Sequence, residues 1–174
     1  MSEAVMKKAS PIIRQMFENY NINILQVEYK NEEVCNHLDK TCGIDYFVVH
    51  TTTGLTHGVA WRAQKVHDTP YDTFTVRKSR KSGAPTEYEK RKRAIEKNGI
   101  YPYYVMQCYV DEVTGDILSM ALTTTKDIID FIENKSPQVK TTGSDKIGQA
   151  EFYVIPWLDM LFCGYNIILY EKKE

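Results

Sequence analysis

The chain has 174 residues and little of what marks a secreted, disulfide-stapled or membrane-spanning protein. Its four cysteines are not spaced as a disulfide framework, and we expect Cys108 and Cys163 to be small residues of apolar strands. The first residues lack an apolar signal segment, and no apolar run approaches the ~18 residues of a membrane span. We therefore expect a reducing, cytoplasmic setting and no membrane partner.

Several motifs that carry known chemistry are also missing. The sequence has no P-loop, no G-x-G-x-x-G and no G-x-S-x-G, and its four histidines form no recognisable catalytic set. Cys35, His37 and Cys42 invite a zinc interpretation, but a structural zinc site takes four ligands and usually includes a close cysteine pair. No C-x2-C pair occurs, so zinc is the weaker interpretation of these three residues.

Charge of one sign is not in excess over the whole chain, but it is locally uneven. The formal net charge is -1, which excludes a general polycation. The segment from Arg77 to Arg93 nevertheless holds eight basic residues against only Glu87 and Glu89. Such a segment indicates either an anionic partner or a solvated helix face. Glu87 and Arg91 are four residues apart, so part of this charge serves helix stability.

Hydrophobic spacing predicts one domain over residues 1–174, with helices and strands in mixed order. Helices are predicted over 2–20, 86–97 and 125–133, with one turn at 157–161. Strands are predicted over 22–29, 44–50, 57–66, 72–78, 103–110, 117–123, 151–156 and 166–170. Residues 134–149 are rich in Ser, Thr, Gly and Lys and predict a mobile loop. The order predicts an α/β or α+β fold with a central mixed sheet flanked by helices.

Polar side chains on two neighbouring predicted strands mark the first candidate site. Asp45 belongs to the first strand of a predicted antiparallel pair, among apolar residues. Because side chains alternate across a strand, Ala60, Arg62 and Gln64 share one face of the second strand. A strand of a globular protein normally turns apolar groups inward, so two large polar groups on one face are unusual. We expect Asp45, Arg62 and Gln64 to point into one concavity, as catalytic or binding residues.

A basic segment follows directly and marks the second candidate site. Arg77, Lys78, Arg80 and Lys81 precede Gly83, which allows a close approach of the backbone, and Thr86 caps the next helix. Arginine and lysine neutralise phosphates, whereas hydroxyl and backbone N–H groups position them. The segment is thus either a phosphate-contacting arm for DNA or RNA or an ordinary soluble loop.

The order of these residues and elements resembles the PD-(D/E)xK nuclease superfamily, whose fold is called restriction-endonuclease-like. In that family a helical acid precedes strands that carry an Asp and then an acid or Gln two residues before a Lys. Here Glu18 matches the helical acid, Asp45 the strand Asp, and Arg62 with Gln64 the following polar pair. The helix after Thr86 matches the crossing helix, and the resemblance covers roughly residues 10–160 as architecture.

The resemblance implies Mg²⁺-dependent hydrolysis of phosphodiester bonds, with Asp45 and Glu18 as metal ligands. The second motif departs from the family pattern, because Ala60 stands where an acid belongs and Arg62 where a lysine belongs. Arginine stays protonated and cannot act as a base. A literal E-x-K at Glu28–Lys30 precedes Asp45, which is the wrong order.

Two functions therefore remain open. One is a nucleic-acid-binding protein that resembles these nucleases and cleaves DNA or RNA with Mg²⁺. The other is a non-enzymatic binding or inhibitor protein of a virus or mobile element, built on the same scaffold. A homodimer and a separate protein partner both stay open, because composition does not decide between them.

Overall fold

In this computed structural model the chain is described over residues 3–18, 22–25, 38, 42–67, 69–142 and 149–172. The helices within these ranges are α1 (Glu3–Glu18), α3 (Glu87–Glu96), α4 (Thr125–Lys135) and α5 (Trp157–Phe162). The strands are β1 (Ile22–Leu25), β2 (Tyr46–His50), β3 (Thr56–Val66), β4 (Thr73–Arg80), β5 (Tyr104–Asp111), β6 (Ile117–Thr124), β7 (Gln138–Thr142), β8 (Ala150–Pro156) and β9 (Ile167–Glu171). The predicted mixture of helices and strands is confirmed.

The main sheet has six strands in the order β1-β2-β3-β5-β6-β9. The strands β1, β2 and β3 form an antiparallel meander, as predicted for the β2–β3 pair. β5 then runs parallel to β3, and β6 and β9 continue antiparallel, so the sheet is mixed. Parallel neighbours need a crossover connection, and here the crossover from β3 to β5 contains β4 and α3. This crossover brings the basic segment over one face of the main sheet.

A second, three-stranded sheet in the order β4-β8-β7 was not anticipated, since the sequence predicted one central sheet. The strand predicted at 72–78 extends to Arg80 and belongs to this second sheet. β7 lies within the predicted loop 134–149, where α4 also continues to Lys135. All five residues of β7 are exposed, so no apolar alternation marked the strand in the sequence. Residues 143–148 of that loop lie outside the described residues.

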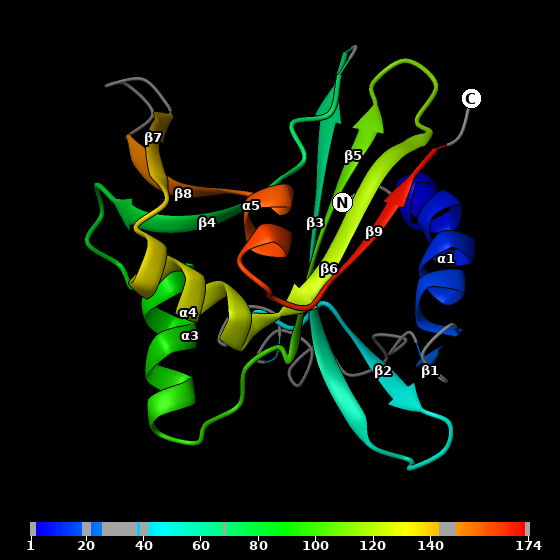
Figure 1. Cartoon of the computed structure of the whole chain (residues 1–174), viewed down its shortest axis with the longest axis horizontal. Coiled ribbons are helices and arrows are strands. Elements are labelled where there is room, and N and C mark those ends of the chain that lie inside the picture. Colours follow the sequence, from blue (N-terminus) through cyan, green and yellow to red (C-terminus); the bar gives the residue numbers. More distant parts are fainter. Residues whose placement is uncertain are drawn as a thin grey trace.

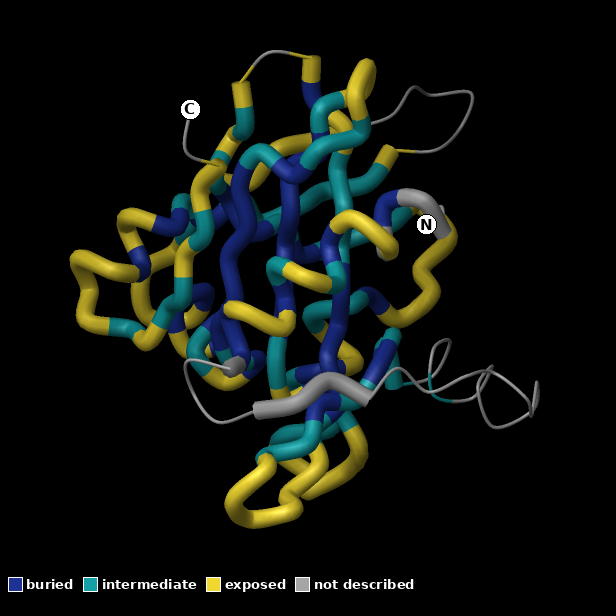
Figure 2. The backbone as a smooth tube through the Cα atoms, turned by 90° about the vertical axis from the view of Figure 1, so that its right-hand side faces the viewer, coloured by how far each residue is buried: buried dark blue, intermediate teal, exposed yellow. Residues whose placement is uncertain are grey.

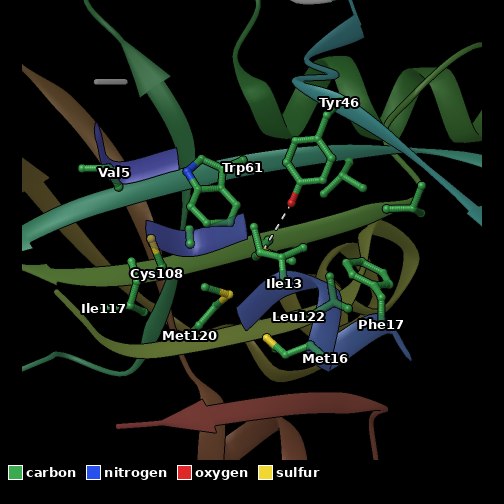
Figure 3. Packing of buried hydrophobic residues seen from close by; sticks show 14 of the residues in the cluster. Val5, Ile13, Met16, Phe17, Tyr46, Trp61, Cys108, Ile117, Met120 and Leu122 are labelled. Atoms are coloured by element: carbon green, nitrogen blue, oxygen red, sulfur yellow. Dashed lines mark hydrogen bonds between the residues drawn. The ribbon is translucent and has the colours of Figure 1, made fainter. Parts of the chain in front are cut away.

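Helix α1 closes one face of the main sheet (Figure 1). Its buried residues, including Ala9, Ile13 and Phe17, pack on side chains from β2, β3, β5 and β6 in one hydrophobic cluster. Figure 3 shows Trp61 and Tyr46 in this cluster, and the Tyr46 hydroxyl donates to Met106 Sδ at 3.4 Å. The helix predicted over 2–20 is thus α1, and Pro11 lies inside it.

The opposite face of the main sheet carries α4, α5 and the second sheet (Figure 1). A second hydrophobic cluster there joins Tyr109 of β5 and Ala121 of β6 to Phe74, Ile128 and Ile155 of the covering elements. In Figure 2 the buried positions run along the middle strands, whereas the turn at residues 51–56 is exposed. The second cluster includes Val66 at the end of β3 and does not include the middle of that strand. This leaves room for a polar site beside β3.

Candidate functional site

A cavity of about 320 Å³ lies between the middle of β3 and β5 on one side and β4 and α3 on the other. Among the described residues, its lining holds five cationic side chains, which are Arg62, Arg77, Arg80, Lys90 and Arg91, and two carboxylates, which are Asp45 and Glu87. Within this described lining, five positive against two negative charges give an excess of three positive charges at neutral pH. Such a concentration of one sign in a concave, partly desolvated space attracts anions.

Arg62 reaches the cavity because of strand parity. It pairs with Gln107 across the parallel β3–β5 register, so both side chains leave the same face of the sheet. Its guanidinium donates to the carbonyl oxygen of Thr75 at 2.8 Å and to the Thr75 hydroxyl at 2.9 Å. A third bond runs from Arg62 Nη2 to Glu87 Oε2 at 3.0 Å. These bonds tie the main sheet to β4 and α3 and fix the position of the Arg62 guanidinium.

A β-bulge in β4 brings Arg77 and Arg80 to the same face. Arg77 opposes Phe152 and Arg80 opposes Ala150, whereas the register between them shifts by one residue. Without the bulge, Arg80 would point to the opposite face of the strand from Arg77. Phe152 and Ala150 are two residues apart on β8, so Arg77 and Arg80 both turn toward the cavity.

The other two residues of the basic segment have a different environment. Lys78 lies at the bulge, and its ammonium is 3.5 Å from a carboxylate oxygen of Glu151. Lys81 is exposed in the turn after β4. Lys78 and Lys81 do not line the cavity, so the structure divides the predicted arm into two residues at the cavity and two outside it.

Glu87 is the counter-ion that holds the arginines together. It is the first residue of α3, whose start is fixed by the Thr86 cap and a reciprocal bond from the Thr86 backbone N–H to the Glu89 carboxylate. One turn later Arg91 donates to Glu87 Oε1 at 2.6 Å, and Arg62 donates to Glu87 Oε2. Burial acts to raise the pKa of Glu87, but the guanidiniums of Arg91 and Arg62 outweigh it and hold that pKa below its ordinary value. Glu87 is therefore ionised at neutral pH.

Four buried donors in the lining lack a hydrogen-bond acceptor among the described residues. Two are the Nε atoms of Arg77 and Arg80, and the other two are Nη1 of Arg91 and Nε2 of Gln107, whose residues are only 5% and 2% exposed. The other amide atom of Gln107, Oε1, accepts a long bond of 3.4 Å from the Thr75 hydroxyl. Leaving a buried donor unpaired costs about 1–3 kcal/mol, and more for a charged group. Arg91 Nη1 and Gln107 Nε2 line the same cavity, so a ligand that carries oxygen acceptors would satisfy both donors together.

Asp45 lies on the cavity wall, one residue before β2, whereas the sequence predicted it inside that strand. Its backbone N–H donates to the carbonyl oxygen of Val59 at 2.8 Å, which extends the β2–β3 pairing by one residue. Its carboxylate accepts a bond from the backbone N–H of Trp61 at 2.6 Å. Asp45 and Arg62 thus line the same concavity, in which the sequence analysis also placed Gln64.

Gln64 is not among the residues that line the cavity. It lies two residues further along β3, opposite Tyr109. Tyr109 is fully buried in the second hydrophobic cluster with Trp157, which occupies this part of the sheet face. The cavity therefore ends between the Arg62–Gln107 pair and the Gln64–Tyr109 pair.

Magnesium would need ligands beyond those the described lining offers. Glu87 is held by Arg62 and Arg91, which leaves Asp45 as the other carboxylate of the lining. Within the described residues, no group of three or more His, Cys, Asp or Glu side chains could hold a metal ion. The backbone of Glu18 ends α1, and its side chain lies outside the description, as do Cys35, His37 and residues 28–30. The described lining by itself fits an anion better than a divalent cation.

Three residues of this site were not singled out as site residues by the sequence. Glu87 and Arg91 were recognised only as a helix-stabilising pair, and Gln107 lies in an apolar strand. Gln107 could have been recognised as the one amide in the apolar run from Val105 to Val110, because a polar side chain in a buried strand needs a hydrogen-bond partner. Only the crossover places α3 and β5 beside β3, and short-range sequence patterns do not specify that packing.

No described helix is both long enough and apolar enough to cross a membrane. Compared with protein-family models and with curated proteins, the chain matches none of them.

Proposed function

We propose that this protein binds DNA or RNA and takes a phosphate group of the nucleic acid into the cavity beside β3. The observation that carries the proposal is the pair of buried donors that have no acceptor within the described part of the chain, Arg91 Nη1 and Gln107 Nε2, in a described lining with three excess positive charges. Phosphate oxygens are strong acceptors, and arginine is the side chain best suited to them. Arg77 and Arg80 extend the positive surface from the cavity along β4.

The resemblance to PD-(D/E)xK nucleases is consistent with this proposal. The elements follow the order that the resemblance implies, with a helix, strands with Asp45 at the start of one, a crossing helix and further strands. Asp45 and Arg62 line one cavity beside β3. This agreement supports a nuclease-like scaffold as the origin of the site, and the membership itself is part of the proposal.

Hydrolysis of phosphodiester bonds with Mg²⁺ is the catalytic form of the same proposal. Asp45 on the cavity wall favours it, and Glu18 would be a further ligand. A bound Mg²⁺ would polarise the phosphate and supply the nucleophilic water. Arg62 would steady charge on the phosphate, but it cannot take a proton from water. Asp45 is the one carboxylate of the described lining besides Glu87, so we expect cleavage to be slow or absent.

The non-enzymatic alternative keeps the scaffold and replaces the nucleic acid by a protein partner. The missing second acid of the motif favours it, since Ala60 lines the cavity where that acid would stand. An acidic surface of another protein would meet the same cations. A virus or mobile element is the kind of source in which we expect such a protein.

Binding to DNA and RNA oligonucleotides over a series of salt concentrations tests the proposal. We expect measurable affinity at low salt and a steep loss as salt rises, because phosphate contacts release counterions. Arg91→Gln should weaken binding by about tenfold or more. Arg93→Gln on the exposed side of the same helix removes the same charge outside the cavity and should have little effect. Absence of binding at low salt, or equal effects of both variants, would contradict the proposal.

Cleavage is tested separately with Mg²⁺, Mn²⁺ or EDTA. Weak activity that needs a divalent ion and disappears in Asp45→Ala would support the catalytic form. Robust cleavage that persists in EDTA and in Asp45→Ala would place the chemistry elsewhere in the chain. Binding without any cleavage would leave the nucleic-acid-binding form and remove the enzymatic one.

A further inference from the structure

We infer that the cavity is selective for a terminal phosphate, the phosphomonoester at the end of a DNA or RNA strand, over a phosphodiester inside the strand. This inference rests on the proposed function, because it names the part of the nucleic acid that enters the site. It follows from the depth, the charge and the donor set of the cavity.

The depth of the cavity favours a terminal phosphate. Of the donors without an acceptor among the residues described, two belong to Arg91 and Gln107, which are only 5% and 2% exposed. An acceptor oxygen must come within about 3 Å of them, below the surface of the protein. An internal phosphate is flanked by two sugars, and both would have to follow it toward the floor of a cavity of about 320 Å³. A terminal phosphate has a sugar on one side only, so the rest of the strand can remain outside.

The positive charge of the cavity lining also favours a terminal phosphate. The lining residues that the structure describes carry an excess of three positive charges, since five cations stand against Asp45 and Glu87. An internal phosphodiester carries one negative charge, whereas a phosphomonoester carries about 1.5 to 2 at neutral pH. The more highly charged group gains more from a desolvated cluster of cations, because electrostatic interactions strengthen where water is excluded.

The hydrogen-bond donors around the cavity favour the same group. Besides Arg91 Nη1 and Gln107 Nε2, the buried Nε atoms of Arg77 and Arg80 have no hydrogen-bond partner among the described residues. These donors come from β4, α3 and β5, so they surround the cavity from three elements. A phosphomonoester offers three terminal oxygens, and a phosphodiester offers two. The larger number of acceptors fits a site that presents donors from several sides.

The existing bonds explain why the site is preorganised. Glu87 fixes Arg62 and Arg91, and Thr75 fixes Arg62 and Gln107. Guanidinium groups of Arg62 and Arg77 also lie over the ring of Phe152, at 5.9 and 5.2 Å from its centre. A ligand therefore meets groups that are already ordered, which reduces the entropy lost on binding.

The experiment compares three oligonucleotides of one sequence, with a 5′-phosphate, a 3′-phosphate or hydroxyl groups at both ends. Affinity is measured by fluorescence anisotropy in EDTA, so that no cleavage intervenes. We expect one of the phosphate-ended strands to bind about tenfold more tightly than the hydroxyl-ended strand, since bonds to charged groups are worth roughly that factor or more. Inorganic phosphate should compete with this added affinity and raise the melting temperature of the protein.

Gln107→Glu is the sharpest variant, because it replaces the unpaired donor by a negatively charged oxygen with almost no change in volume. It should abolish the preference for the phosphate-ended strand. Gln64→Glu adds the same charge on the same sheet but outside the cavity lining, and it should keep the preference. If Gln107→Glu does not fold, Arg80→Gln removes another lining cation from the less buried rim and should reduce the preference.

The outcomes separate this inference from the proposed function. Tight binding of all three strands with equal affinity would overturn the inference and leave nucleic-acid binding standing. No binding of any strand, together with stabilisation by inorganic phosphate, would overturn both nucleic-acid statements and leave a phosphate site for another ligand. A phosphate preference that survives Gln107→Glu and Arg80→Gln would place the end-recognition site elsewhere and overturn the inference.

Discussion

The two faces of the main sheet are built from the same strands but carry opposite chemistry. Toward α1, β3 and β5 present Trp61, Met106 and Cys108, which are buried in a continuous apolar cluster. Toward α3 and β4, the alternate positions present Arg62 and Gln107 to a charged cavity. Among the described residues, the apolar cluster toward α1 holds no buried polar atom without a partner, whereas the cavity face holds buried donors without acceptors.

This difference shows how one sheet separates stability from recognition. Packing on α1 buries apolar side chains, which is the main favourable contribution to folding. The cavity face buries cations and an amide. Burying these polar groups is unfavourable unless a ligand accepts their hydrogen bonds. We therefore expect substitutions on the two faces to have opposite signatures in stability and in binding.

The largest effect is expected on the face toward α1. Phe17 is fully buried and contacts Tyr104 edge to face, so Phe17→Ala should lower the free energy of unfolding by about 3–5 kcal/mol. Affinity for nucleic acid should be unchanged in the fraction that remains folded. Phe162→Ala is the matched control, because Phe162 is 83% exposed and its removal should cost little. Urea unfolding of both variants measures the difference.

Glu87→Gln should have the next largest effect, because it removes the counter-ion of Arg62 and Arg91. The free energy of unfolding at neutral pH should fall by about 2 kcal/mol, less than for a fully buried pair because Glu87 keeps some solvent contact. The cavity gains one positive charge, so affinity for phosphate should rise in the same variant. A parallel loss of stability and affinity would show that Glu87 only shapes the site and would break the comparison.

The pH dependence of stability gives a separate test of Glu87. Its pKa is lower in the folded protein than its ordinary value of 4.5, so its ion pairs stabilise the fold fully above about pH 4.5. This contribution disappears as the pH falls through the folded pKa. The wild type should therefore lose more stability than Glu87→Gln between about pH 5 and pH 3. Identical pH profiles would mean that Glu87 has no depressed pKa.

A smaller effect of opposite sign is expected for Gln107→Leu on the cavity face. Within the described structure Nε2 of Gln107 has no partner and Oε1 has one long bond, so an apolar side chain of similar volume should stabilise the protein by about 1 kcal/mol. Affinity for nucleic acid should fall in the same variant. A clear loss of stability would indicate that the amide is already satisfied, which would remove the main argument for a ligand.

The smallest effect concerns a surface contact away from both faces. Asp116 accepts bonds from Lys8 of α1 and from Lys172 after β9, and these bonds lower the pKa of Asp116 to about 2. All three side chains are well exposed, so salt and water screen the interaction. Asp116→Asn should lower the melting temperature slightly at low salt and not at high salt. A large effect at high salt would show that this contact, and not the apolar cluster, holds α1.

Local patterns predicted much of the fold. The capped helix after Thr86, the β2–β3 pair and the shared face of Ala60 and Arg62 follow from capping and alternation, which depend on near neighbours in the sequence. The second sheet was missed because β7 is exposed throughout and carries no apolar alternation. Its pairing with β8 depends on backbone bonds, which residue types specify weakly.

The candidate site was predicted only in part, for a similar reason. Strand parity brought Asp45 and Arg62 together, but strict alternation would send Arg77 and Arg80 to opposite faces of β4. The bulge between Arg77 and Ser79 brings both arginines to the cavity, and no residue type in the segment predicts a bulge there. Gln107 enters the site through long-range packing of β5 beside β3, which periodicity alone does not reveal.

The most direct measurement is a crystal structure of the protein soaked with tungstate, a phosphate analogue that anomalous scattering locates without ambiguity. We expect one ordered tungstate in the cavity, with oxygens within hydrogen-bond distance of Arg91 Nη1 and Gln107 Nε2. Crystals of Gln107→Glu should lack that peak. An empty cavity in wild-type crystals, with tungstate bound only at Lys78 or Lys81 on the surface, would contradict the account.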